Sequence, residues 1–279
     1  MSTIFNPYSF FDHGKLTTHF DLTGPDSSPV VVLVPGATLP LAVWHSLVTP
    51  LVEAGFRVLR YDLPGRGYSS QYPGQADLNA HVQQIAELLE GLNIRQPVHI
   101  VGLALGAILA AEFAATHQGH VLSAALIAPD GLATRFTAAE RLFIAPVVGD
   151  FLLPLLASRI LLRRVPRYSK DPNVRELVRD LLRFALRGTH FRKALLASIR
   201  ELPIHEGEVY YLRLAETQVR SWAVWGSEDH ITPVVAADSI RKIFGPDTVC
   251  VLQGLGHLPF VEEPRNVASL LTTHFNRSR

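Results

Sequence analysis

The sequence predicts an α/β fold in which a mostly parallel sheet carries helices on both faces. Short β-branched runs alternate with longer helical patterns through the first half of the chain and again near its end. This alternation is typical of a parallel sheet that is buried on both sides. From about residue 134 to 216 the alternation stops and the pattern is helical. We therefore expect one α/β core, formed by residues 1–133 and 217–279, with a helical insertion at residues 134–216.

The first half supplies four strands of this core. Each is a short apolar run that ends in a turn signal, and the runs are Val30–Val34, Arg57–Tyr61, Val98–Val101 and Leu122–Ile127. Helical patterns between them predict helices over Leu41–Ala54, Leu78–Leu92 and Leu105–His117. Ahead of these elements, Phe5–Asp12 and Leu16–Leu22 flank His13-Gly14 and predict a hairpin at the edge of the sheet.

The clearest helix of the insertion is Asn173–Arg187. Asp171 can cap it, Pro172 suits the first helical position and Gly188 ends the pattern. One side is an apolar stripe, and four arginines that we expect to face solvent follow another side at Arg175, Arg179, Arg183 and Arg187. The alternation then resumes with strands expected at Val219–Val224 and Thr248–Leu252 and helices at Val234–Ile243 and Val261–Phe275.

The insertion is basic and contains a long apolar run. It holds fifteen Lys or Arg and nine Asp or Glu, whereas the rest of the chain holds eleven and sixteen. Within Leu142–Ser158, Asp150 and two prolines argue against a membrane-spanning helix. We expect this run to form an amphipathic lid that lines the mouth of the site. The arginines are interpreted as a solvated face or, alternatively, as a peripheral contact with anionic lipid.

Composition excludes several classes of protein. The 26 basic and 25 acidic residues of the 279-residue chain almost cancel, so the molecule as a whole is not an electrostatic binder of nucleic acid. Cys250 is the single cysteine, which excludes an intrachain disulfide and a cysteine-rich metal site. The first residues lack the basic and apolar regions of a secretory signal, and we expect a cytoplasmic protein.

The candidate chemistry lies in loops that follow the strands, where open α/β sheets bind their ligands. The first two loops are Val34–Thr38 and Asp62–Ser69, the third is Gly102–Gly106, and the last two are Trp225–Asp229 and Gly256–Pro264. In their order and spacing these loops resemble the α/β-hydrolase family over essentially the whole chain. The resemblance is to capped members such as monoacylglycerol-lipase-like and meta-cleavage-product hydrolases, and it implies that residues 134–216 form a helical cap over the active site.

The chain departs from the family pattern at the nucleophile elbow. The nucleophile elbow of the family is G-x-S-x-G after a strand, and this chain has Ala104 at the position of the serine. A methyl group cannot attack a carbonyl carbon or form an acyl intermediate. As written, the chain is expected to be an inactivated form. Either a serine was replaced by alanine, which we favour, or this is a natural member that binds a ligand without catalysis.

The remaining catalytic parts are present by the same resemblance. His257 would be the general base, and Asp229 would orient its ring. The oxyanion hole would be formed by the backbone N–H groups of Ala37 and Leu105. The usual histidine of the first loop is replaced by Pro35. The alternative interpretation is structural, with Asp229 as a helix cap and His257 as a buried core residue.

The sequence thus predicts a hydrolase of carboxylic esters in the form with serine at position 104. The insertion is rich in large aliphatic side chains, which favours a small-molecule ester with an apolar acyl part. The mechanism needs no metal and no organic cofactor. Hydrolysis of a carbon–carbon bond of the meta-cleavage type is the nearest alternative, and a non-catalytic ligand-binding protein is the alternative from another class. The substrate's chain length and the oligomeric state stay open.

Overall fold

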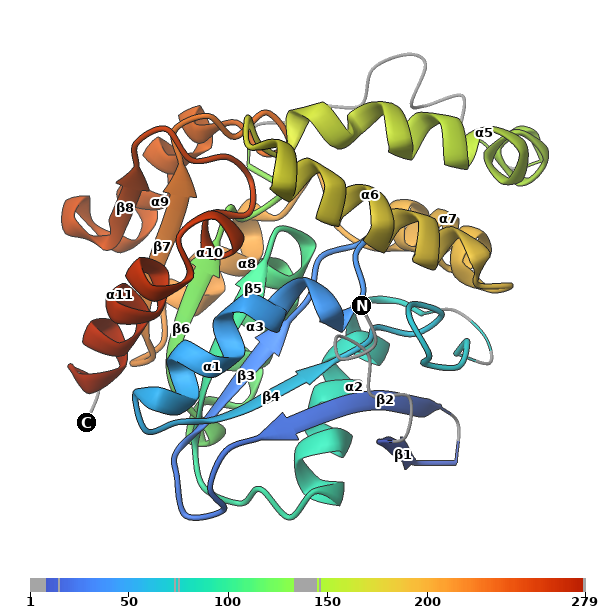
Figure 1. Cartoon of the computed structure of the whole chain (residues 1–279). Helices are drawn as coiled ribbons and strands as arrows, with labels where there is room; N and C mark the ends of the chain where they lie inside the picture. Colours follow the sequence, from blue (N-terminus) through green and yellow to red (C-terminus); the bar gives the residue numbers. More distant parts are fainter. Residues whose placement is uncertain are drawn as a thin grey trace.

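The computed structural model describes residues 9–14, 16–72, 74, 76–132, 145 and 147–277. Within them, eight strands form one sheet in the order β1-β2-β4-β3-β5-β6-β7-β8 (Figure 1). The first two pairs, β1 with β2 and β2 with β4, are antiparallel, and all other neighbours in this sheet are parallel. The predicted α/β fold with a mostly parallel sheet is therefore confirmed.

The strands form where β-branched and aliphatic runs can be buried on both faces. All residues of β3 and β5 are buried, because these strands lie in the middle of the sheet. The strand bounds are β1 (Phe10–Asp12), β2 (Thr17–Thr23), β3 (Val30–Val34), β4 (Arg57–Tyr61), β5 (Val98–Leu103), β6 (Val121–Ile127), β7 (Arg220–Gly226) and β8 (Val249–Leu252). The hairpin predicted at His13-Gly14 is present as β1 and β2, while Phe5–Tyr8 lie outside the described residues.

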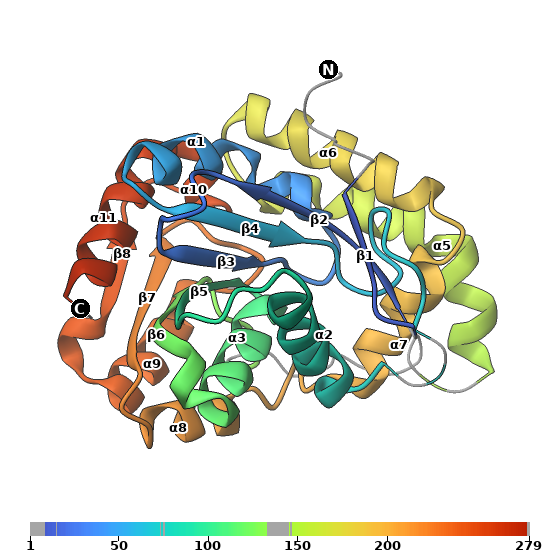
Figure 2. The same ribbon diagram turned by 90° about the horizontal axis from the view of Figure 1, so that it is seen from below.

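Helices cover both faces of the sheet (Figure 2). One face carries α1 (His45–Glu53) and α11 (Pro264–Asn276), and the other carries α2 (Leu78–Gly91), α3 (Leu105–Thr116), α8 (Glu208–Ala215) and α9 (Ala237–Phe244). The Asp77 side chain caps α2 by accepting a hydrogen bond from Ala80 N at 2.8 Å. A short helix, α10 (Pro259–Glu262), leads into α11.

A group of helices lies over the carboxyl ends of the parallel strands (Figure 1). It consists of α5 (Val148–Arg164), the 3₁₀ turn η3 (Val165–Arg167), α6 (Pro172–Arg187) and α7 (Phe191–Glu201). As predicted, Asp171 caps α6 by accepting from Asn173 N, and Gly188 follows its last residue. Residues 134–144 and 146 of the predicted insertion lie outside the described residues. The last helix of the predicted insertion, α8, instead packs against α3 beside the sheet.

The apolar run that was expected to line the mouth of the site presents large side chains outward. Phe151 and Leu155 of α5 are 72% and 76% exposed. The helix uses another side for packing, where Ala157 and Leu161 are buried. The expectation is therefore wrong for these two side chains, because periodicity shows that a helix is amphipathic without showing which neighbour it meets. No helix in the described part of the chain combines the length and the apolar character needed to cross a bilayer.

Candidate active site

The parallel strands end in register at one edge of the sheet. Val34 pairs with Gly102, Leu103 with Ile127, Ile127 with Val224, and Gly226 with Leu252. The loops that follow these strands therefore emerge side by side, beneath the helices that lie over this edge. This register brings together the loops that carry Ala37, Ala104, Asp229 and His257, although they are separated by up to 220 residues in the sequence.

Ala104 occupies a strained turn between β5 and α3. Its backbone has φ +50° and ψ −113°, a conformation that costs a non-glycine residue about 1–3 kcal/mol. Two glycines permit the turn. A Cβ atom on Gly102 would lie 2.2 Å from the carbonyl oxygen of Gly106, and a Cβ atom on Gly106 would lie 2.4 Å from that of Val34. Strand, turn and helix can approach this closely only without those side chains.

Two backbone N–H groups beside Ala104 have no acceptor among the described residues, and they belong to Ala37 and Leu105. Leu105 is the first residue of α3, where the helix dipole adds positive potential. Ala37 follows Gly36, and a Cβ atom on Gly36 would lie 3.8 Å from Cβ of Ala104. Donors in this arrangement are suited to binding a negatively charged oxygen.

Asp229 and His257 form a buried hydrogen-bonded pair. Oδ2 of Asp229 lies 2.8 Å from Nδ1 of His257, and each residue is only 3% exposed. Oδ1 also accepts hydrogen bonds from the backbone N–H groups of Ile231 and Thr232 at 2.7 and 2.9 Å. Burial alone would raise the pKa of Asp229, but the charge of His257 and these hydrogen bonds outweigh it and lower the pKa. The carboxylate therefore stays ionised next to the imidazole.

Thr232 contacts both residues of this pair, and the sequence did not predict it. Its hydroxyl lies 2.8 Å from Oδ2 of Asp229, 3.1 Å from the carbonyl oxygen of Ala128 and 3.3 Å from Nδ1 of His257. It thus connects the loops that follow β6, β7 and β8. The signal that could have found it is its place directly after Ile231, whose backbone N–H closes an Asx turn with Asp229.

A second missed residue, Tyr168, joins the overlying helices to the site. Its carbonyl oxygen accepts a hydrogen bond from His257 N at 2.7 Å, and its hydroxyl lies 3.3 Å from Oγ1 of Thr38. The two rings meet edge to face with their centroids 5.4 Å apart. Burial raises the pKa of Tyr168, so its hydroxyl is neutral. Because a Cβ atom on Gly256 would lie 2.2 Å from the Tyr168 carbonyl oxygen, only glycine allows this approach.

Arg66 is a buried cation below the first loop. Its guanidinium donates to the carbonyl oxygens of Ala37 and Pro64 at 3.1 and 2.9 Å and to the hydroxyl of Ser198 on α7 at 2.7 Å. No carboxylate among the described residues lies within ion-pair distance of it. Burial lowers the pKa of Arg66 to about 10, so it is still charged at neutral pH. Arg66 therefore holds the Ala37 loop to α7.

Asp130 adds a second carboxyl group to this region. It follows β6, and its backbone N–H donates to the carbonyl oxygen of Ala104 at 3.3 Å. Its side chain accepts a hydrogen bond from Gly131 N at 3.0 Å. Burial raises the pKa of Asp130, although the charge of His257 acts in the opposite direction. Asp229, which bonds directly to His257, and not Asp130, is therefore the carboxylate paired with the histidine.

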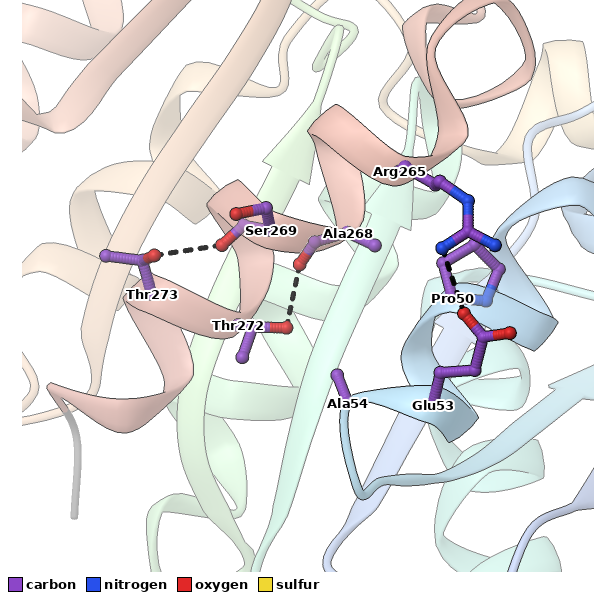
Figure 3. Close-up of a pocket in the computed structure, with 8 residues that line it drawn as sticks. All are labelled: Pro50, Glu53, Ala54, Arg265, Ala268, Ser269, Thr272 and Thr273. Atoms are coloured by element: carbon purple, nitrogen blue, oxygen red, sulfur yellow. Dashed lines mark hydrogen bonds and ion pairs between the residues drawn. The ribbon is translucent and has the colours of Figure 1, made fainter.

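A groove between α1 and α11 lies away from these loops (Figure 3). An ion pair between Arg265 and Glu53 at 3.1 Å spans it. Thr272 and Thr273 donate their hydroxyl protons to carbonyl oxygens of their own helix. The two charged side chains are thus paired with each other and the two threonine hydroxyls with the helix.

Comparisons with known proteins agree with this geometry. The sequence profile described as the alpha/beta hydrolase family matches residues 31–270. The chain belongs to the alpha/beta hydrolase family. The monoacylglycerol lipase ABHD6 of Bos taurus is 23% identical over 264 residues, which are 88% of this chain and 75% of the lipase.

Two further relatives illustrate the range of the family. The 2-hydroxy-6-oxononadienedioate/2-hydroxy-6-oxononatrienedioate hydrolase of Burkholderia vietnamiensis is 29% identical over 234 residues, which are 80% of this chain and 78% of that enzyme. The crystal structure of the enol-lactonase from Burkholderia xenovorans superposes with a TM-score of 0.77 at 17% identity, covering 96% of this chain and all of that one. The fold and the membership of a hydrolase family are thus established.

Proposed function

We propose that this chain carries the active site of a carboxylic ester hydrolase whose nucleophile position is occupied by Ala104. The observation that carries the proposal is the hydrogen bond of 2.8 Å between buried Asp229 and His257, in the loops that accompany the strained turn at Ala104. The paired groups have the chemistry of a general base and its orienting acid. A buried hydrogen-bonded Asp–His pair also occurs at Asp62 and His19, so the pair alone does not indicate catalysis. The position of Asp229 and His257 in loops at the same edge of the sheet as the strained turn at Ala104 supports the catalytic role.

In the form with serine at position 104, each group has a defined task. The serine hydroxyl attacks the ester carbonyl carbon while His257 accepts its proton through Nε2, and Asp229 stabilises the resulting imidazolium. The N–H groups of Ala37 and Leu105 stabilise the oxyanion of the tetrahedral intermediate. His257 then protonates the leaving alcohol, and a water molecule activated by the same histidine hydrolyses the acyl enzyme.

In the present chain the first step is blocked, because the Ala104 methyl group has no lone pair and no proton to transfer. The chain is therefore proposed to be an inactivated form. Substitution of a serine is the explanation that we favour, since Asp229, His257 and their hydrogen bonds are intact. A natural non-catalytic member that binds a ligand is the alternative.

We propose an apolar ester as the substrate. Helices α5, α6 and α7 would act as the cap, and the interior of this layer contains Leu, Val and Phe side chains that suit an acyl chain. The lipase relative supports this class. A second candidate, hydrolysis of a carbon–carbon bond, is favoured by the identity of 29% with the 2-hydroxy-6-oxononadienedioate hydrolase. Neither reaction requires a cofactor.

The test is to restore the nucleophile. Ala104→Ser should hydrolyse p-nitrophenyl esters or monoacylglycerols, with kcat above that of the original chain by up to about 10⁶-fold, the size of the loss when a serine hydrolase loses its nucleophile. His257→Ala in the same background should remove the gained activity. Ala104→Gly is the matched control, because it accepts the same backbone conformation and provides no hydroxyl.

The outcomes separate the candidates. Turnover of vinylogous 1,5-diketone acids without ester hydrolysis would select the carbon–carbon hydrolase. A folded Ala104→Ser chain that is silent on both panels would contradict hydrolysis and leave the ligand-binding protein.

A further inference from the structure

The outer side of α5 carries a concentration of exposed apolar side chains. Val147, Val148, Phe151 and Leu155 are 66%, 37%, 72% and 76% exposed. Val148, Phe151 and Leu155 follow one another at spacings of three and four residues, which places them along one side of the helix, and Val147 precedes its first residue. The buried residues Ala157 and Leu161 face another side, where α5 packs against α6 and α7. We call this outward side, from Val147 to Arg163, the α5 face.

The same face becomes cationic toward the end of the helix. Arg159 and Arg163 continue the four-residue spacing from Leu155, and both are exposed. Neither makes an ion pair or hydrogen bond with a described residue. The acidic residue of α5, Asp150, is neutralised by Arg200 at 2.8 Å. The face therefore combines apolar side chains with uncompensated positive charge.

The α5 helix lies on the outer side of the group of helices above the sheet. Among the elements that the structure describes, it is farther from the carboxyl ends of the strands than α6 is (Figure 1). Its 17 residues extend over about 25 Å, so the apolar and the cationic ends can contact one surface together. An anionic lipid interface satisfies both ends at once, because acyl chains lie directly beneath negatively charged headgroups.

We propose that the α5 face docks this protein on an anionic lipid surface. Phe151 and Leu155 enter the upper acyl region together with the two valines, and Arg159 and Arg163 contact lipid phosphates. The attachment is peripheral, and it holds the edge of the sheet that carries Ala104 and His257 toward the lipid.

The arginines of α6, which the sequence had also suggested for such a contact, are less suited to it. Arg183 is within 3.4 Å of Asp180, and Nε of Arg175 donates to the carbonyl oxygen of Ser169. Arg175 and Arg179 are half-buried, so only two of the four face solvent freely. The large exposed apolar side chains of the described residues also do not include any on α6. Lipid contact is therefore assigned to α5.

The test is co-sedimentation of the unmodified chain with vesicles. One set contains phosphatidylcholine alone, and the other contains phosphatidylcholine with phosphatidylglycerol. Two variants probe the two halves of the face, Phe151→Ser/Leu155→Ser for the apolar half and Arg159→Gln/Arg163→Gln for the cationic half. The matched control is Val209→Ser/Leu212→Ser on α8, since these side chains are 44% and 47% exposed and their neighbour Arg213 is paired with Glu112.

We expect binding to the anionic vesicles that weakens as salt is added, because salt screens the arginine charges. The partition coefficient should fall about tenfold or more in the Phe151→Ser/Leu155→Ser variant. It should fall by about fivefold for each arginine removed in the other variant. The α8 control should bind as the unmodified chain does. Thermal unfolding shows that each variant is folded.

Three outcomes would overturn the proposal. The first is the absence of binding to anionic vesicles at low salt. The second is equal binding by the unmodified chain and by the folded Phe151→Ser/Leu155→Ser variant. The third is a dimer in size-exclusion chromatography that this variant abolishes, because the α5 face would then be covered by a second copy of the chain. None of these measurements depends on catalysis.

Discussion

Ala104 occupies a strained backbone conformation that is held by hydrogen bonds of its main chain. Its N–H donates to the carbonyl oxygen of Ile127 at 3.0 Å, and its own carbonyl oxygen accepts from Ala107 and Asp130. These bonds hold a conformation with φ +50° that an alanine does not adopt freely. The strand, the turn glycines and the helix therefore impose this conformation, and under the proposed function the side chain at position 104 decides only whether a nucleophile is present.

At the same scale, Arg66 is expected to position the oxyanion-binding loop. It bonds to the carbonyl oxygen of Ala37, whose N–H is one of the two proposed donors. In the Ala104→Ser background, Arg66→Met should lower kcat by about 10²-fold with a smaller change in KM, as the loss of one such donor does. Arg66→Lys should rescue little, because an ammonium group cannot reproduce the guanidinium fork.

Ser198→Ala is the control for this prediction, since it removes one of the three acceptors of Arg66 and leaves the bond to Ala37 in place. Its kcat should change less than that of Arg66→Met. If Arg66→Met is stably folded and keeps its kcat, Arg66 has no positioning role. Steady-state kinetics and thermal unfolding of the three variants decide this.

Among the elements, those with strong local signals could be predicted from the sequence. Val30–Val34 and Arg57–Tyr61 form strands with the predicted bounds, because β-branched runs between turn residues leave little alternative. The predicted helix Leu41–Ala54 instead begins as the 3₁₀ turn η1 (Leu41–Trp44) before α1. Helix ends depend on the hydrogen bonds of the last turn, which periodicity does not specify.

The elements of the site were predicted less completely. Loop order placed Ala104, Asp229 and His257 at one edge of the sheet, because parallel strands share their carboxyl edge. Thr232 and Tyr168 could not be found in this way, since their contacts with His257 depend on how distant segments pack. The exposure of the Phe151 side chain on α5 could not be predicted for the same reason.

For the whole molecule, buried histidines predict how stability depends on pH. Burial lowers the pKa of His81 and of His274 to about 4. The unfolded chain, in which these groups titrate near 6.5, therefore binds more protons than the folded chain between about pH 4 and 6.5. The free energy of unfolding should fall as the pH drops through this window, by up to about 3 kcal/mol for each histidine.

Urea unfolding at pH 7.5, 6.0 and 5.0 measures this dependence. His81→Gln should flatten it, because the substituted side chain does not titrate. The raised pKa of Asp130 works in the opposite direction, since a carboxyl group that keeps its proton in the folded state favours folding at low pH. A pH dependence that is the same in the original chain and in folded His81→Gln would show that the contribution of His81 is absent.

The central claim is that position 104 is a nucleophile position with the rest of its machinery intact. It is tested most directly by treating the Ala104→Ser chain with a fluorophosphonate probe and locating the adduct by mass spectrometry. We predict an adduct at position 104, none on the original chain, and labelling at least about 10²-fold slower in Ala104→Ser/His257→Ala, because His257 activates the hydroxyl. A folded Ala104→Ser chain that remains unlabelled, or that is labelled only at another serine, would contradict the claim.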